Sequence, residues 1–238
     1  MTLPHDSWAD RYEAVMQLTF GPLYDVLTST AMEEIRQRVP APAAVVDFGA
    51  GCGRLAIPLA AEGYRVTAVE PSVAMLEELR RNAQGYPIDF IHSRMEDYRT
   101  DRPHDFALCV FTVLAYVLDT EALTAGFEAV AAALAPGGLF LVDVPDESVF
   151  QSFDHDSADI IRGVRIEPIA DSLYEYDEHT TLRTELGQVS YSDRFALRHW
   201  TKDEILAALA DAGFTTADDV TRRFAGLGAE YLLMRRKG

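Results

Sequence analysis

Short apolar segments alternate with helical patterns through the first two thirds of the chain. The apolar runs have the length of buried strands and lie at residues 45–48, 65–69, 88–91, 105–111 and 139–144. Strands that alternate with helices are typical of a parallel sheet covered by helices on both faces. Two further apolar runs near 220–224 and 230–235 bring the expected strands to seven, with the last one antiparallel. The pattern therefore predicts an α/β fold with a doubly wound, seven-stranded sheet.

Helix signals separate these strands. Apolar residues at helical spacing predict one or two helices over 8–39, broken near Gly21. Ser72 is a candidate N-cap for a helix at 73–82, and Thr201 and Glu204 form a capping-box pattern before a helix at 205–212. Two further helices are expected at 54–62 and 120–134. Each helix lies between two expected strands or flanks the sheet.

The alternation of strands and helices stops between residues 145 and 198. There Val189, Tyr191, Phe195 and Leu197 fall at even spacing, and Gly187-Gln188 separates them from a similar pattern at 182–186. This pattern is typical of an antiparallel hairpin with one buried face. We therefore expect a single domain with four parts: a helical cover at 1–43, a ligand-binding core at 44–144, a small antiparallel β insertion acting as a lid at 145–200, and a last helix and strands at 201–238.

A glycine-rich turn follows the first strand. Asp47 lies within that strand, and Gly49, Ala50, Gly51, Cys52 and Gly53 carry the chain into the next helix. Glycines at such a turn allow a ligand to approach the backbone, and the amides that open the helix point toward it. A dinucleotide fingerprint requires a glycine at position 54, which is Arg54, so a nicotinamide-dependent oxidoreductase is disfavoured. The Asp-x-Gly-x-Gly-x-Gly pattern instead resembles motif I of the class I S-adenosylmethionine-dependent methyltransferases, which have a Rossmann-like fold.

The resemblance covers roughly residues 45–144 and implies that S-adenosylmethionine is the cofactor. Glu70 and Pro71 follow the second strand, where a carboxylate would bind a ribose diol. The adenine-binding acid of the family aligns with Arg94, so Met95 and Glu96 take that place as candidates. The resemblance implies the following cofactor-binding residues: Asp47, Gly49, Ala50, Gly51, Gly53, Glu70, Pro71, Met95, Glu96, Phe111, Thr112 and, in the helical cover, Tyr12.

Composition narrows the possible partners. The 38 acidic and 21 basic residues give a formal charge of −17, which disfavours a nucleic-acid partner. Two cysteines, Cys52 and Cys109, predict neither a disulfide framework nor a metal site. The sequence shows no secretory signal and no apolar stretch long enough for a membrane span, so we expect a cytoplasmic protein. A monomer and a homodimer both remain open.

The expected reaction is direct methyl transfer to a small-molecule acceptor at nitrogen, oxygen or carboxylate. Such a displacement depends on in-line positioning, and a base is needed only if the acceptor must lose a proton. Weak candidates for that role are His155, His179, His199 and Tyr191 in the insertion. Two other functions share this cofactor-site pattern: a non-catalytic protein that binds S-adenosylmethionine or S-adenosylhomocysteine, and an aminopropyltransferase, for which we find no distinct motif.

Overall fold

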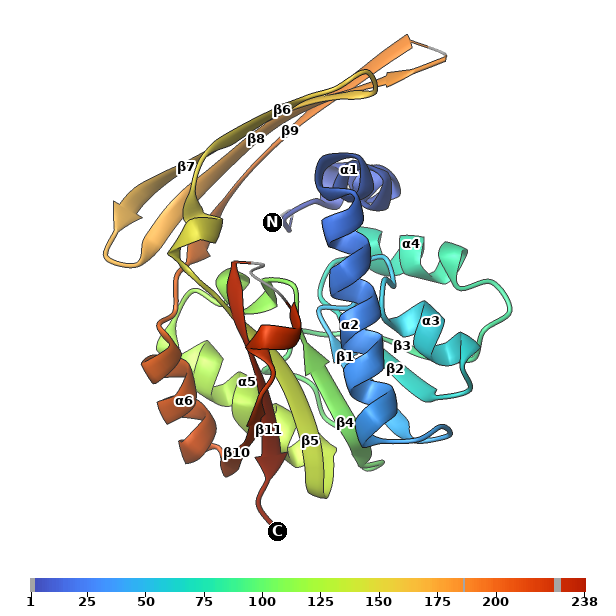
Figure 1. Ribbon diagram of the computed structural model, residues 1–238, viewed down its shortest axis with the longest axis vertical. Helices are drawn as coiled ribbons and strands as arrows, with labels where there is room; N and C mark the ends of the chain where they lie inside the picture. Colours follow the sequence, from blue (N-terminus) through green and yellow to red (C-terminus); the bar gives the residue numbers. More distant parts are fainter. Residues whose placement is uncertain (1–2, 186, 225–227) are drawn as a thin grey trace.

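The computed structural model describes residues 3–185, 187–224 and 228–238, which form two sheets (Figure 1). The larger sheet has seven strands in the order β10-β11-β5-β4-β1-β2-β3. Its strands are β1 Ala44–Phe48, β2 Arg65–Glu70, β3 Ile88–His92, β4 His104–Cys109, β5 Leu134–Pro145, β10 Phe214–Asp219 and β11 Ala229–Arg236. Strands β1 to β5 are parallel, and β11 runs antiparallel to both of its neighbours. The predicted doubly wound sheet with an antiparallel last strand is confirmed.

Helices cover both faces of this sheet and enclose two apolar cores. On one face α2, α3 and α4 pack on the strands, and on the other face α5 and α6 do so (Figure 1). The α-helices are α1 Tyr12–Phe20, α2 Pro22–Arg38, α3 Ala56–Ala61, α4 Val73–Asn82, α5 Thr120–Ala133 and α6 Lys202–Asp211. The 3₁₀ helices are η1 Asp6–Arg11, η2 Val113–Tyr116, η3 Glu147–Phe150 and η4 Thr221–Phe224. Burial of strands on both faces explains the continuous apolar runs of β1 and β4.

Two expected helix caps are present. The Ser72 hydroxyl accepts a hydrogen bond from the Met75 amide at the start of α4. Thr201 and Glu204 form a complete capping box at the start of α6. These side chains satisfy amide groups that have no partner within the helix. Both predicted caps are therefore confirmed, and α4 begins where expected, whereas α6 begins three residues before the expected 205.

The insertion folds into a second sheet of four antiparallel strands, β6 Phe153–Asp156, β7 Ile160–Ala170, β8 Leu173–Thr184 and β9 Gly187–Arg198. The hairpin expected around Gly187-Gln188 is β8 paired with β9. This second sheet arches over the N-terminal segment, η1 and α1 (Figure 1). On its inner face, the Arg162 guanidinium makes two hydrogen bonds to the fully buried Glu178 carboxylate and a third to the Thr19 hydroxyl of α1. The buried ion pair therefore joins the second sheet to the helical cover.

The strand expected near residues 220–224 lies earlier in the chain. Gly213 ends the helical region, and β10 begins at once at Phe214, whereas Thr221–Phe224 is the 3₁₀ helix η4. The Asp219 carboxylate accepts a hydrogen bond from the Thr221 amide and starts this turn. Phe224 is buried, and its ring stacks on that of Tyr231 with 3.7 Å between centroids. An apolar residue in a buried turn was thus mistaken for part of a strand.

Candidate functional site

The glycine loop lies between β1 and α3 at the carboxyl edge of the larger sheet. The Gly49 amide donates a hydrogen bond to the Val69 carbonyl oxygen over 2.9 Å, which ties the loop to β2. Gly49 has a φ of +72°, and a Cβ there would lie 2.6 Å from Val113 Cγ2. Gly51 has a φ of +53°, yet a Cβ there would meet no atom within 4 Å. The loop is therefore closely packed at Gly49 and open at Gly51.

Glu70 holds this loop from the end of β2. Its Oε2 accepts a hydrogen bond from the Gly51 amide and its Oε1 from the Ser72 amide, each over 2.9 Å. The side chain is buried, and burial raises its pKa, while these two amide donors oppose that rise. A carboxylate has about four lone-pair positions, so further positions remain for a ligand. Pro71 follows, and its carbonyl oxygen accepts a hydrogen bond from His92 Nε2.

Phe111 and Thr112, which follow the end of β4, have left-handed backbone conformations. Their φ values are +71° and +67°, which is unusual for residues with side chains. The Asp143 carboxylate in β5 stabilises this turn, because its Oδ2 accepts hydrogen bonds from both amides over 2.9 Å. Burial raises the pKa of Asp143 to about 7, against the effect of these two donors. Asp143 was not among the predicted site residues, although an acid within the apolar run 139–144 was a signal for it.

The positive charge of Arg54 acts on two buried acids of this region, Asp47 and Asp143. Its guanidinium lies 3.1 Å from the ring centroid of Phe111 and 4.0 Å from that of Tyr24. The Nη1 atom is buried and has no hydrogen-bond partner. Burial raises the pKa of Asp47 to about 7, and the charge of Arg54 opposes this rise. A stacked arginine with an unpaired N–H group is suited to binding an anion.

The N-terminal segment, residues 3–12, packs against the glycine loop and the start of α4. The Ser72 hydroxyl donates a hydrogen bond to Asp6, and the Ala9 carbonyl oxygen lies 3.5 Å from Cys52 Sγ. Tyr12 packs against the apolar group formed by Ala9, Cys52 and Met75. Burial raises the pKa of Tyr12 to about 12, so its phenol stays protonated at neutral pH. Tyr12 therefore lies beside the glycine loop, as its candidate role requires.

Met95 and Glu96 lie after β3. Met95 is buried in the core on the α5 face, and a Cβ on Gly126 of α5 would lie 2.5 Å from its Cε. Glu96 is partly exposed, and one of its oxygens lies 3.8 Å from Arg94 Nη1. Met95 is thus fixed by packing, whereas Glu96 pairs with the arginine at the position where the family has an acid. Their contact with a cofactor stays a prediction.

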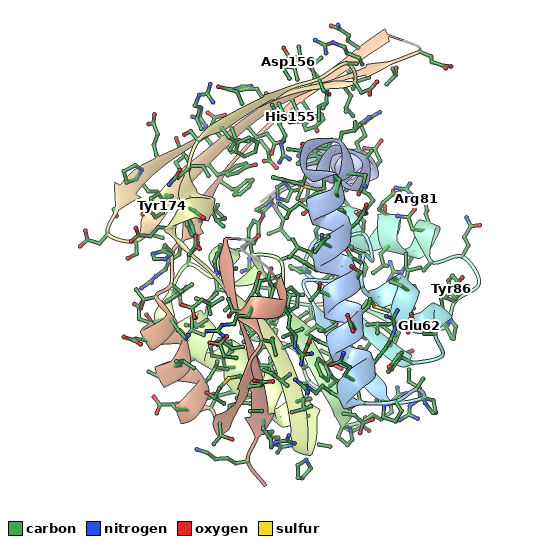
Figure 2. All side chains as sticks on the ribbon, in the orientation of Figure 1. Glu62, Arg81, Tyr86, His155, Asp156 and Tyr174 are labelled. Atoms are coloured by element: carbon green, nitrogen blue, oxygen red, sulfur yellow. The ribbon has the colours of Figure 1, made fainter. Side chains whose placement is uncertain are left out.

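The four candidates for a base lie at separate places on or beside the second sheet. Tyr191 stacks on Trp8 with 4.7 Å between centroids, and His199 packs edge-on against Phe150. His155 lies on β6 toward one end of the sheet, far from Tyr174 at the other end (Figure 2). The His155 Nε2 atom is buried without a partner. The structure does not bring these four side chains into one cluster.

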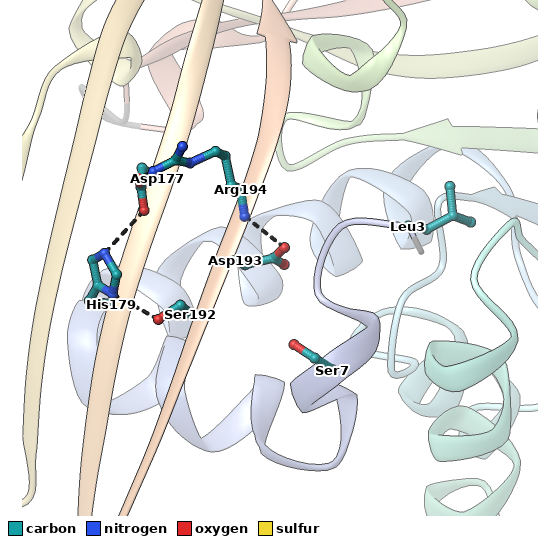
Figure 3. A pocket seen from close by; sticks show the side chains of 7 residues that line it. All are labelled: Leu3, Ser7, Asp177, His179, Ser192, Asp193 and Arg194. Carbon is teal, nitrogen blue, oxygen red and sulfur yellow. Dashed lines mark hydrogen bonds and ion pairs between the residues drawn. The ribbon is translucent and has the colours of Figure 1, made fainter. Parts of the chain in front are cut away.

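His179 lies on β8, an inner strand of the second sheet, with its side chain exposed. Its ring contacts the Ser192 hydroxyl and the Asp177 carboxylate, at a hollow of about 310 Å³ that also includes Leu3 and Ser7 (Figure 3). The side chain is 71% exposed, and Ser192 is its direct cross-strand neighbour. This geometry is common for polar residues on the solvent face of a sheet. It does not place His179 near the glycine loop residues.

Within residues 3–185, 187–224 and 228–238, no group of three or more His, Cys, Asp or Glu side chains has a geometry that could hold a metal ion. In the same part of the chain, no helix is long and apolar enough to cross a membrane.

The sheet order and the glycine loop define a Rossmann-like domain, and comparison with known proteins shows which proteins it is similar to. Residues 45–138 match the family described as a methyltransferase domain. The ubiquinone biosynthesis O-methyltransferase of Methylocella silvestris is 39% identical over 98 residues, which are 40% of this chain and 37% of that protein. The dTDP-4-amino-2,3,4,6-tetradeoxy-D-glucose N,N-dimethyltransferase of Saccharopolyspora spinosa is 24% identical over 212 residues, or 86% of this chain and 84% of that protein. Alignments with the first three curated relatives span between 28% and 58% of their lengths.

Solved structures show the same fold over nearly the whole chain. An S-adenosylmethionine-dependent methyltransferase from Clostridium acetobutylicum aligns with a TM-score of 0.84 and 17% identity, covering 96% of this chain and 99% of that one. An amino pentose methyltransferase from Micromonospora echinaspora gives 0.78 and 21%, covering 95% and 96%. At these identities the likeness shows the fold. The chain therefore shares the fold of these S-adenosylmethionine-dependent methyltransferases, and its residues 45–138 are similar to the methyltransferase-domain family.

Proposed function

We propose that this protein is an S-adenosylmethionine-dependent methyltransferase that acts on a small-molecule acceptor. The observation that carries the proposal is the glycine loop, whose Gly51 amide is held by Glu70 and whose Gly51 position opens onto free space. This geometry occurs in a chain with the methyltransferase fold. The named relatives methylate both oxygen and nitrogen, which supports a small acceptor without choosing the atom.

The side chains at this edge fit the chemical groups of S-adenosylmethionine. Glu70 keeps lone pairs for the ribose hydroxyls, and the unpaired Nη1 of Arg54 suits the carboxylate of the methionyl part. Phe111 and Thr112, fixed in their turn by Asp143, lie at the strand end where ligands bind in open α/β sheets. Bound there, S-adenosylmethionine would supply an activated methyl group on a sulfonium. The chain's own contribution is to orient the two reactants and to exclude water.

The experiment that tests this proposal is calorimetric titration of the protein with S-adenosylmethionine, with NADH as the control ligand. We expect binding of S-adenosylmethionine alone. In Glu70→Ala the free energy of binding should weaken by about 1.5 to 3 kcal/mol, the usual contribution of a charge-assisted hydrogen bond. The matched control is Glu62→Ala, which removes the same charge from an exposed ion pair with Arg36. Binding of NADH, or equal affinity in both variants, would contradict the assignment.

Turnover separates an enzyme from a protein that only binds the cofactor. The protein is incubated with S-adenosylmethionine carrying a radiolabelled methyl group and with a panel of small amines, phenols and carboxylic acids. Transfer of label to an acceptor supports catalysis. Binding without transfer to any member of the panel would favour the non-catalytic function.

A further inference from the structure

A buried histidine and a partly exposed tyrosine form a hydrogen-bonded pair beside the proposed site. His5 Nε2 lies 2.9 Å from the hydroxyl oxygen of Tyr116. His5 is 8% exposed, whereas Tyr116 exposes 37% of its surface. Tyr116 ends η2, the short helix that directly follows the left-handed turn at Phe111 and Thr112. The tyrosine therefore follows the strand end where, if the proposed function holds, the methyl group is delivered.

His5 is held firmly in one orientation. Its ring packs against Trp8, Tyr12 and Phe195, with centroids 4.9 to 5.2 Å apart. Its backbone has a φ of +68°, a conformation that residues other than glycine rarely adopt. The packing of three aromatic rings holds the residue in this strained state, and such strain is frequent at functional sites.

The surroundings determine which ring nitrogen carries the proton. The Asp193 carboxylate of β9 accepts a hydrogen bond from the His5 amide, and its Oδ2 lies 3.7 Å from His5 Nδ1 (Asp193 is drawn in Figure 3). His5 Nδ1 makes no hydrogen bond, but the negative charge of the nearby carboxylate favours the proton on that nitrogen, which leaves a lone pair on Nε2. Tyr116 must then donate its hydroxyl proton to Nε2. The free lone pairs of the tyrosine oxygen are left to accept a hydrogen bond from a ligand.

We propose that Tyr116 binds the methyl acceptor as a hydrogen-bond acceptor, that His5 and Asp193 position it for this role, and that the acceptor is therefore an amine. This inference rests on the proposed function. Tyr116 would contact the substrate, whereas His5 and Asp193 act through Tyr116.

Charge development in the reaction explains the preference for nitrogen. The lone pair of a neutral amine forms the new N–C bond, and the S–CH₃ bond breaks with its electrons remaining on sulfur. The nitrogen becomes positively charged and later releases a proton to water. A hydrogen bond from its N–H group to the Tyr116 oxygen strengthens as that charge develops, so it stabilises the transition state more than the bound substrate.

The other acceptor classes fit this arrangement less well. A carboxylate has no hydrogen to donate to the Tyr116 oxygen, and its charge would face the electron pairs of that oxygen. A hydroxyl must lose its proton to a base. Burial, followed by the charge of Arg162, lowers the pKa of His5 to about 3, so the imidazole cannot retain that proton at neutral pH.

The test combines a measurement that needs no acceptor with one that does. Nitrogen NMR of the protein, labelled at histidine, reports the His5 tautomer. We expect a protonated Nδ1, an unprotonated Nε2, and a shift of the Nε2 resonance in Tyr116→Phe but not in Tyr86→Phe. Tyr86 is an exposed residue between α4 and β3, far from the second sheet (Figure 2). A proton on Nε2 would overturn the proposal, since Tyr116 would then have to accept from His5.

Radiolabelled methyl transfer to benzylamine, benzyl alcohol and benzoate tests the acceptor class. We expect label on benzylamine, and a kcat that is lower by about ten- to a hundredfold in Tyr116→Phe with an unchanged dissociation constant for S-adenosylmethionine. Preferential labelling of benzoate or benzyl alcohol, or an unchanged kcat, would overturn the inference. If the protein binds S-adenosylmethionine but labels no probe, the His5 tautomer decides whether the inference stands: a proton on Nδ1 supports it, and a proton on Nε2 overturns it. Failure to bind S-adenosylmethionine would instead refute the proposed function.

Discussion

Asp143 offers a quantitative test of the site, because its role depends on a single buried carboxylate. Its pKa is raised by burial to about 7 from the ordinary value of 3.8. The folded protein therefore binds the proton more tightly than the unfolded chain. The stability from this group is fully present below the unfolded pKa and is lost as the pH rises toward the folded value. With 1.36 kcal/mol for each pKa unit, the loss between about pH 5 and pH 8 is about 3 kcal/mol.

The perturbation is Asp143→Asn, which keeps an oxygen for the Phe111 and Thr112 amides and removes the titration. The assay is urea unfolding of the cofactor-free protein, followed by circular dichroism at both pH values. The wild-type free energy of unfolding should fall from pH 5 to pH 8 by about 3 kcal/mol more than that of the variant. Asp47, whose pKa is also raised to about 7, predicts a similar difference for Asp47→Asn. An identical pH dependence in wild type and Asp143→Asn would refute the reasoning.

Three further changes test packing and capping, each by urea unfolding. Gly49→Ala places a Cβ against Val113 at a positive φ, and we expect a loss of about 2 to 4 kcal/mol; no loss would mean that the loop is not closely packed. Arg162→Met leaves Glu178 buried without its cation and should cost about 3 to 5 kcal/mol, and adding Glu178→Gln should restore part of it. Thr201→Ala removes the α6 cap and should cost about 1 kcal/mol, whereas a cost near zero would make the cap dispensable.

Local signals in the sequence were sufficient for most of the fold. The run from Val45 to Phe48 is buried on both faces as β1, and Ser72 caps α4. Each of these features is determined within a few residues, the strand by a continuous apolar run and the helix start by a capping side chain. The strand expected near residues 220–224 failed because Phe224 is buried through a contact with Tyr231, seven residues away, and not through strand pairing. An apolar residue alone does not distinguish these two causes of burial.

The candidate site was predictable only in part, for the same reason. Gly51 and Glu70 were marked by position within a motif, and a hydrogen bond joins them in the structure. Asp143 and His5 were missed, because each acts on residues far away in the sequence. Asp143 lies 31 residues from Thr112, and His5 lies 111 residues from Tyr116. Such pairs depend on strand order and on the path of the N-terminal segment, which no short motif encodes.

The N-terminal segment connects the two halves of the proposed site. Asp6 accepts a hydrogen bond from Ser72 beside the glycine loop, while one residue earlier the His5 amide donates to Asp193 of the second sheet. Trp8 stacks on Tyr191 of the same sheet, and Ala9 lies against Cys52 of the loop. Residues of this segment thus contact both the region of the glycine loop and the second sheet. A displacement of this segment would therefore disturb both its contacts with the glycine loop and the orientation of Tyr116. In the proposed enzyme this would couple cofactor binding to the positioning of the acceptor.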